Sequence, residues 1–245
     1  ISSDENEGTV DKSSLTFTSE DWDTVQTVTV TGQDDGESDG DEAYTIILGT
    51  PTTTDTFYAA INPADVSVTN VEQIIITQQA YLKAPNAESG DTFGRMVAIS
   101  GDTIVIASPS EGSNQTTITN GTTASSDNSA LNSGAAYVFV RTGLTWFQQA
   151  FLKASNADSG DVFGEYGVAI DGNTIVVGTN RESSNQSTIT NGTTASSDNS
   201  ALNAGAAYVF VRSGTTWSQQ AYLKAPNSET NDSFAYSLAV SGDAI

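Results

Sequence analysis

A short acidic loop is the part of this sequence best suited to bind an ion. Residues 34–42 read DDGESDGDE, which places six carboxylates within nine residues. Calcium prefers several hard oxygen ligands, many of them charged, on a flexible loop. Carboxylates so close together repel one another unless a cation lies between them. The loop therefore predicts a calcium site, and the alternative interpretation is a solvated loop in a very acidic protein.

The predicted ligands come from this loop and from one later segment. Loops at one end of a β-sandwich lie close together, so Asp4, Glu5, Asn70 and Glu72 are second-rank candidate ligands. The predicted metal ligands are Asp34, Asp35, Glu37, Asp39, Asp41, Glu42, Asn70 and Glu72.

The residue types that usually carry catalysis are missing from the chain. It has no His and no Cys, which removes the usual general base, the usual zinc ligand and any disulfide. A nucleophile with its base can then be built only from carboxylates or Lys. The sequence therefore predicts that the protein is not an enzyme.

The charge balance excludes two classes of partner. The formal net charge is −22, from 30 acidic and 8 basic residues. Nucleic acids and anionic membranes both require patches of Lys and Arg. No apolar run approaches the roughly 20 residues of a membrane-spanning helix. We therefore expect neither nucleic-acid binding nor membrane insertion.

The chain must position these residues on a repeated framework. One stretch begins at Gln78, again at Gln148 and a third time at Gln219, at intervals of 70 and 71 residues. A fixed period of this length marks a repeat architecture. The third copy stops at Ile245, at the position of an inner hairpin. We therefore expect either a longer chain or completion by neighbouring copies, head to tail, as a filament.

Each full repeat contains four short segments with strand character. In the first copy they cover residues 95–100, 103–108, 135–141 and 145–153. The first two are continuously apolar, as in strands buried on both faces, whereas the last mixes apolar residues with Gln and Lys. This rise in polarity is typical of a propeller blade, whose outer strand meets solvent. The pattern predicts tandem four-stranded antiparallel β-propeller-type blades.

Several motifs in these copies resemble one known family. Phe93-Gly94 is followed by ASP at residues 107–109, and GAAYVF and W-x-QQAYLKA segments follow in order. These motifs resemble the FG-GAP repeat of integrin-type β-propellers, in its bacterial variety. The resemblance implies two full blades plus partial ones. The third copy departs from the motif at Ala235. In all three copies the hairpin between the first two strands is too tight for the calcium loop that many members carry, so no propeller calcium site is expected.

The first seventy residues suggest a different β domain. Residues 15–18, 26–31, 43–48 and 65–70 are short segments, largely alternating, separated by turn formers, which predicts a β-sandwich. The acidic loop lies between the second and third, and its D-D-x-x-x-x-G-D-E pattern resembles Calx-β domains. That resemblance implies an immunoglobulin-like sandwich with calcium at one end, here lacking its first strands. The expected domains are residues 1–73 and 74–245.

A polar tract inside each repeat is nearly identical in the two copies. Residues 113–132 and 184–203 differ only at Thr116 and Ser187. Three interpretations stay open. The first is recent duplication. The second is a structured loop that packs on the next repeat, on a neighbouring chain or on a sugar, and the third is a cation site. The cation site would use Asp127, Asn128, Asp198 and Asn199. N-x-S/T sequons occur at Asn114, Asn120, Asn185, Asn191 and Asn231.

Other recurring residues point to structure rather than chemistry. Asp91, Asp161 and Asp232 precede x-Phe in each copy, which predicts turn capping. Trp146 and Trp217 are equivalent, so packing is favoured over sugar stacking. Together these features predict an extracellular, non-catalytic, calcium-stabilised adhesive or structural module of a larger surface protein or filament. Its expected partners are further copies of itself or adjacent domains, with surface glycans as a further possibility. The alternative is a carbohydrate-binding or polysaccharide-processing β-propeller.

Overall fold

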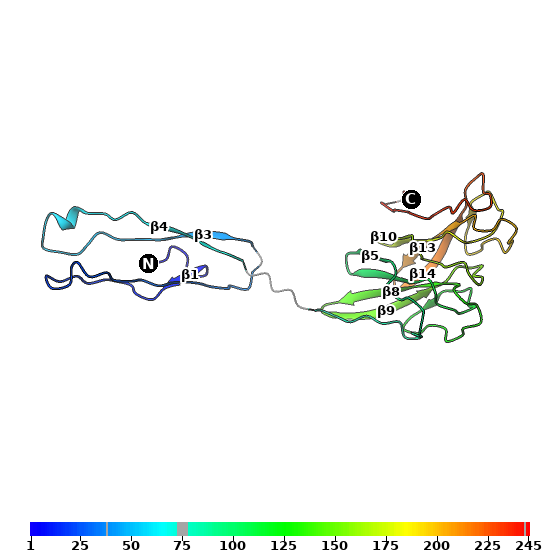
Figure 1. Cartoon of the computed structure of the whole chain (residues 1–245), viewed down its shortest axis with the longest axis horizontal. Helices are drawn as coiled ribbons and strands as arrows, with labels where there is room; N and C mark the ends of the chain where they lie inside the picture. Colours follow the sequence, from blue (N-terminus) through cyan, green and yellow to red (C-terminus); the bar gives the residue numbers. More distant parts are fainter. Residues whose placement is uncertain (38, 73–77, 243) are drawn as a thin grey trace. The chain divides into compact units, whose positions relative to one another are not determined.

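The fold was described from a computed structural model, which covers residues 1–37, 39–72, 78–242 and 244–245. The chain forms two compact units, Ile1–Thr77 and Gln78–Ile245. Both are built from antiparallel strands (Figure 1). The helix in the described part is the single 3-10 turn η1, Tyr58–Ala60. The all-β prediction is therefore confirmed. The predicted boundary after residue 73 falls among residues outside the described ranges and stays a prediction.

The first unit contains two small sheets. Strand β1 (Gly8–Val10) pairs with β2 (Val30–Gly32), and β3 (Glu42–Ile46) pairs with β4 (Val66–Asn70). Tyr44 and Ile46 on β3 are each 5% exposed and form the buried apolar part of this unit. The remaining chain of the unit is mostly irregular.

Two predicted strands of this unit are wrong in extent. Residues 15–18 are irregular, and only the last two residues of segment 26–31 lie in β2. Alternating apolar residues favour a strand when one face is covered. Here Leu15 is 38% exposed and Phe17 is 54% exposed, so the apolar side chains of the first segment have no covering layer in the described residues of the unit. A predicted sandwich is not established by these two small sheets.

The second unit contains two sheets with the same topology. The first has the order β5-β6-β8-β9-β7. Its strands are β5 (Val97–Ser100), β6 (Thr103–Ser108), β7 (Thr119–Asn120), β8 (Ala135–Thr142) and β9 (Thr145–Leu152). The second sheet repeats this order with β10 (Val168–Asp171), β11 (Thr174–Thr179), β12 (Thr190–Asn191), β13 (Ala206–Ser213) and β14 (Thr216–Leu223).

The four strands predicted in each repeat are confirmed within about two residues in the first copy. The sheets nevertheless have five strands, not four. The fifth, β7 or β12, is a two-residue strand supplied by the polar tract, and it pairs with the outer strand β9 or β14. A short strand flanked by Thr, Asn and Gly carries little hydrophobic periodicity, which is why the sequence did not reveal it.

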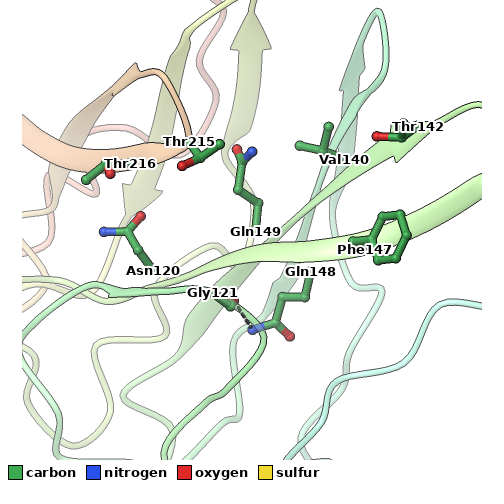
Figure 2. Close-up of a pocket in the computed structure, with 9 residues that line it drawn as sticks. All are labelled: Asn120, Gly121, Val140, Thr142, Phe147, Gln148, Gln149, Thr215 and Thr216. Atoms are coloured by element: carbon green, nitrogen blue, oxygen red, sulfur yellow. Dashed lines mark hydrogen bonds between the residues drawn. The ribbon is translucent and has the colours of Figure 1, made fainter.

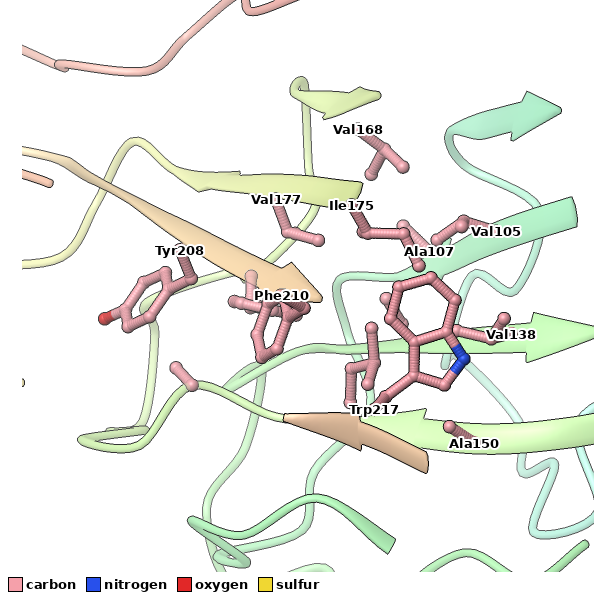
Figure 3. Packing of buried hydrophobic residues seen from close by; sticks show 14 of the residues in the cluster. Val105, Ala107, Val138, Ala150, Val168, Ile175, Val177, Tyr208, Phe210 and Trp217 are labelled. Atoms are coloured by element: carbon pink, nitrogen blue, oxygen red, sulfur yellow. The ribbon is translucent and has the colours of Figure 1, made fainter. Parts of the chain in front are cut away.

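A continuous apolar layer joins the two sheets. Val105 and Val138 of the first sheet are fully buried against Ile175 and Phe210 of the second. Trp217, at 1% exposure, lies in the same layer and is turned toward Val138 and Ala150 (Figure 3). The far face of the second sheet is covered in turn by the third copy. Its side chains Phe234, Leu238 and Val240 pack on Val176 and Val209.

Candidate functional site

Three carboxylates of the first unit lie close enough to share one cation. Ligand oxygens of Glu7, Asp35 and Asp39 are all within 4.8 Å of one another. Glu7 immediately precedes β1, whereas Asp35 and Asp39 follow β2, so the pairing of β1 with β2 brings them together. Asx-type bonds shape the loop, because Asp35 Oδ1 accepts from the Glu37 amide at 2.9 Å.

Neighbouring polar groups orient this cluster. Asn70, the last residue of β4, donates from Nδ2 to Glu7 Oε2 at 3.1 Å and to the Gln33 carbonyl at 2.6 Å. The Glu72 amide donates to Asp41 Oδ1 at 3.0 Å. The cluster lies in a depression of about 180 Å³. These contacts hold both walls of the depression in place.

The eight predicted ligands are distributed unevenly around this depression. Asp35 and Asp39 belong to the three-carboxylate cluster, and Asp34, Asn70 and Glu72 also line the depression. Asp34 accepts from the Gly36 amide within its own turn, whereas Asp41 accepts from the Glu72 amide in the later segment. Glu37 and Glu42 are exposed and outside the cluster. Sequence reasoning missed Glu7. The available signal was the short GTV segment directly after Glu7. It forms β1, and the start of β1 lies beside the end of β2, from which the acidic loop follows.

Each repeat of the second unit contains a buried lysine–glutamate pair. Lys153 Nζ lies 3.0 Å from Glu111 Oε2, and both side chains are almost fully buried. Nζ also donates to the Ser113 and Gly134 carbonyls and to Ser133 Oγ. Burial lowers the pKa of Lys153, and the charge of Glu111 opposes that shift. Because Lys153 follows β9 and Glu111 follows β6, this pair ties the loop before the polar tract to the segment that opens the next repeat.

The second repeat contains the equivalent pair with fewer partners. Lys224 Nζ lies 2.8 Å from Glu182 Oε2. Ala204 stands where the first copy has Ser133, so one acceptor is lost. An asparagine completes both clusters: Asn86 donates to Glu111 Oε1 at 3.3 Å, and Asn156 donates to Glu182 Oε1 at 3.1 Å. Both clusters are held by buried internal partners, more of them around Lys153 than around Lys224, and this indicates a structural role.

The polar tract is an ordered connection to the next repeat. The Asn120 side chain accepts from the Trp217 amide at 2.8 Å and donates to the Trp217 carbonyl at 3.1 Å. At the other end of the tract, the carbonyls of residues 131–133 accept hydrogen bonds from the amides of Gly160, Val162 and Phe163. Of the open interpretations, packing on the next repeat is therefore observed.

The tract aspartates are occupied by N–H and O–H donors. Asp127 Oδ2 accepts from the Asn114 amide at 2.9 Å and from the Ser129 hydroxyl at 2.8 Å. Asp198 makes the same contacts with Asn185 and Ser200. These donors, the backbone amide first, lower the pKa of both carboxyls. Groups surrounded by donors act as turn caps, which disfavours the cation interpretation of the tract.

The recurring aspartates cap turns, as predicted. Asp91 Oδ2 accepts from the Glu88 amide at 2.8 Å, Asp161 from the Asp158 amide at 3.0 Å, and Asp232 from the Glu229 amide at 2.7 Å. Burial raises the pKa of Asp161 to about 7; the Asp158 amide opposes this shift and the nearby Glu182 charge adds to it. The three residues hold the turn ahead of each Phe.

The Phe-Gly pair connects a turn to its own sheet and to the preceding one. Phe163 packs edge-on against Tyr208 and Phe210, at centroid distances of 5.5 and 6.1 Å. Phe93 has the same neighbours in its own copy, Tyr137 and Phe139. The Gly164 amide donates to the Gly178 carbonyl at 2.9 Å. A Cβ at Gly164 would lie 2.6 Å from the Ala107 Cβ, so the glycine permits close approach of successive sheets.

Comparison with known families decides the identity of these repeats. Residues 76–139 and 146–210 match the FG-GAP repeat, which together cover just over half of the chain. The chain belongs to the FG-GAP repeat family. No curated protein and no solved structure matches it.

FG-GAP repeats are typically adhesion or structural modules, are usually found in extracellular or surface proteins, and are generally not enzymes. In the part of the chain that the structure describes, no helix has the length and apolar character needed to cross a bilayer.

Proposed function

We propose that this chain is a non-catalytic structural or adhesive module of a larger bacterial surface protein or filament. Its FG-GAP repeats would act as propeller-type blades, and its first unit as a Calx-β-like domain stabilised by calcium. The observation that carries the proposal is the set of bonds between successive repeats. Each full repeat is bound to the next by a buried ion pair, as between Lys153 and Glu111, and by the ordered tract.

Such connections suit a module that carries load or presents a surface rather than one that performs chemistry. Breaking a buried ion pair typically costs about 3–5 kcal/mol. The polar groups at the repeat junctions, Glu111 and Lys153 among them, are bound to one another. A framework joined by buried internal bonds, in a chain with a net charge of −22, is consistent with an extracellular role.

Exposure on intact cells tests this proposal. Cells that produce the full protein are labelled with an antibody to the second unit, before and after treatment with an external protease. We expect labelling of intact cells, removal by the protease, and weaker surface attachment of a deletion strain. Labelling that requires cell lysis would contradict the proposed location.

Calcium binding is proposed for the cluster of Glu7, Asp35 and Asp39. Three charged oxygens, with further donors from Asp34 and Glu72 around the same depression, suit the hard-ligand preference of calcium. A site formed only in the folded unit stabilises it by RT ln(1 + [L]/Kd), or about 2.7 kcal/mol at a hundredfold excess of calcium over Kd. The melting temperature of the first unit should therefore rise with calcium.

A matched pair of variants separates binding at the cluster from the total charge of the loop. D35N/D39N removes two cluster carboxylates and should abolish the calcium effect. E37Q/E42Q removes two exposed loop carboxylates outside the cluster and should retain most of it. Melting curves that are the same with calcium and with chelator would eliminate the site, and equal losses in both variants would mean that the loop acts only through its total charge.

A further inference from the structure

A groove lies between the two sheets of the second unit, beside contacts that hold the repeats together. It has a volume of about 420 Å³, within the range of small-molecule sites. One wall is the β8–β9 hairpin, with Thr142 and Phe147. The other is the start of β14, with Thr215 just before it and Thr216 in it, and Figure 2 shows these side chains on opposite sides of Gln149.

The lining of the groove carries no charged side chain. None of the lining residues is ionisable, although the chain carries 30 acidic residues. The available groups are amides, hydroxyls, the Val140 side chain and one aromatic ring. An amide and hydroxyl lining provides both donors and acceptors in fixed positions. It matches a ligand with many neutral hydroxyl groups better than a cation, a phosphate or a hydrocarbon.

Three amide side chains of the lining are held in place before any ligand arrives. Gln149 Oε1 accepts from Trp217 Nε1 at 2.8 Å and from Arg212 Nη1 at 3.3 Å, which directs its Nε2 donor away from these partners. Asn120 is fixed on the Trp217 backbone. Gln148 donates to two tract carbonyls. A site with fixed donors loses little conformational entropy on binding.

The aromatic residue of the groove distinguishes it from the equivalent place in the second repeat. Phe147 lies in a W-F-Q-Q sequence and is 54% exposed, whereas the second copy has Ser218 in W-S-Q-Q. The flanking residues are the same, so the ring is not needed to form the strand. An exposed ring beside neutral hydrogen-bonding groups is suited to stack on the apolar face of a pyranose.

We propose that this groove binds a neutral saccharide of one or two residues. Phe147 stacks on the sugar ring, and Gln149 Nε2 with the hydroxyls of Thr142, Thr215 and Thr216 bonds its hydroxyl groups. The inference rests on the proposed adhesive function and names the ligand class that adhesion would use.

Saturation-transfer NMR on the full chain tests the site. The probes are glucose, galactose, mannose, N-acetylglucosamine and their common disaccharides, with glucuronate as the charged comparison. We expect at least one neutral probe to bind, with glucuronate weaker. Because the second copy tolerates serine, F147S should fold normally and weaken binding at least about tenfold. S218F, the matched control, should leave binding at the groove unchanged.

The outcomes separate the saccharide site from the function on which it rests. Binding of no neutral probe, equal binding to F147S, or equal binding of glucuronate would overturn the site. If the protein is nevertheless exposed on cells, the proposed surface role stands without it. A protein that is not exposed on intact cells would overturn the surface role, and sugar binding in vitro would then have to serve another function.

Discussion

Trp146 and Trp217 occupy the same position in two nearly identical repeats and have different surroundings. Trp217 is 1% exposed, and its amide and carbonyl are both bonded to Asn120 of the preceding repeat. Trp146 is only half-buried; its indole bonds Gln79 at 3.2 Å. The tryptophan therefore serves the contact between repeats. Its side chain is buried only where the polar tract of a preceding repeat packs against it.

The small residues at the two junctions show the same dependence. At the first junction Gly164 faces Ala107, and at the second Ala235 faces Gly178. Each junction thus holds one glycine and one alanine, in opposite order. Ala235 has φ of 64°, a conformation that favours glycine. The departures from the FG and GAP motifs are consequently paired, and they preserve the close approach of successive sheets.

The largest expected effect distinguishes the two buried ion pairs. In E182Q, Lys224 loses its carboxylate partner, and such a buried unpaired charge costs about 3–5 kcal/mol. In E111Q, Lys153 keeps three other acceptors, so the loss should be smaller. Denaturant unfolding followed by tryptophan fluorescence measures both. A W22F background restricts the signal to the second unit.

The double variant E182M/K224M is the control for this comparison. Replacing both partners by apolar side chains of similar volume is often close to neutral. Recovery of stability in the double variant would assign the loss to the uncompensated charge. Equal losses in E111Q and E182Q would show that the extra acceptors of Lys153 contribute nothing, which would contradict the comparison.

A second contrast concerns pH. Burial raises the pKa of Asp161 to about 7, so the folded state holds this proton more tightly than the unfolded state, in which an aspartate has a pKa of about 3.9. Its contribution is fully present below pH 4 and is lost as the pH rises through 7. At 1.36 kcal/mol per pKa unit, the loss is about 4 kcal/mol at most.

Substitution by asparagine isolates this contribution. D161N keeps a neutral acceptor for the Asp158 amide, and it should flatten the fall in stability between pH 4 and pH 8. D91N, the same change at the equivalent turn, is the matched control and should leave the slope in place. An unchanged slope in D161N would assign the pH dependence to other groups.

The framework of the second unit could be predicted from the sequence because its signals are local and repeated. Continuous apolar runs such as residues 103–108 and turns such as Gly101 and Gly143 fix four strands without any tertiary information. The strand β7 could not be predicted, because it exists only through its pairing with β9. The same holds for residues 15–18, where an alternating pattern lacks a layer to pack against.

The candidate sites were less predictable for the same physical reason. The acidic loop identified Asp35 and Asp39, but Glu7 joins them through the pairing of β1 with β2, which is a long-range contact. The role of Lys153 was invisible, because its partner Glu111 lies 42 residues away. The groove beside Phe147 requires two repeats to form.

A third prediction tests the paired small residues. In G178A the new Cβ would lie 2.3 Å from the Ala235 carbonyl oxygen, so the third copy must shift, at a cost of about 1–3 kcal/mol. The double variant G178A/A235G recreates the order found at Ala107 and Gly164. It should recover part of the loss, since glycine at residue 235 removes the Cβ that would lie 3.3 Å from the new methyl group and relieves the positive φ, whereas the carbonyl contact remains. Changes in melting temperature that are strictly additive in G178A, A235G and the double variant would contradict the proposed pairing of the two residues.

The smallest expected effect tests whether the tract acts between repeats. Asn120 and Asn191 are equivalent tract residues, but the Asn120 amide makes two bonds to the Trp217 backbone, whereas no such bond involves Asn191 in the described part of the chain. N120A should therefore cost about 1–2 kcal/mol in the unfolding free energy and expose the Trp217 indole, with a red-shifted emission. N191A should change stability by less than about 0.5 kcal/mol. Because the flanking tract sequences are the same, any effect on local turn structure is shared and cancels in the difference. Equal losses would mean that this asparagine stabilises its own tract, and the buried state of Trp217 would then have to follow from the apolar layer alone.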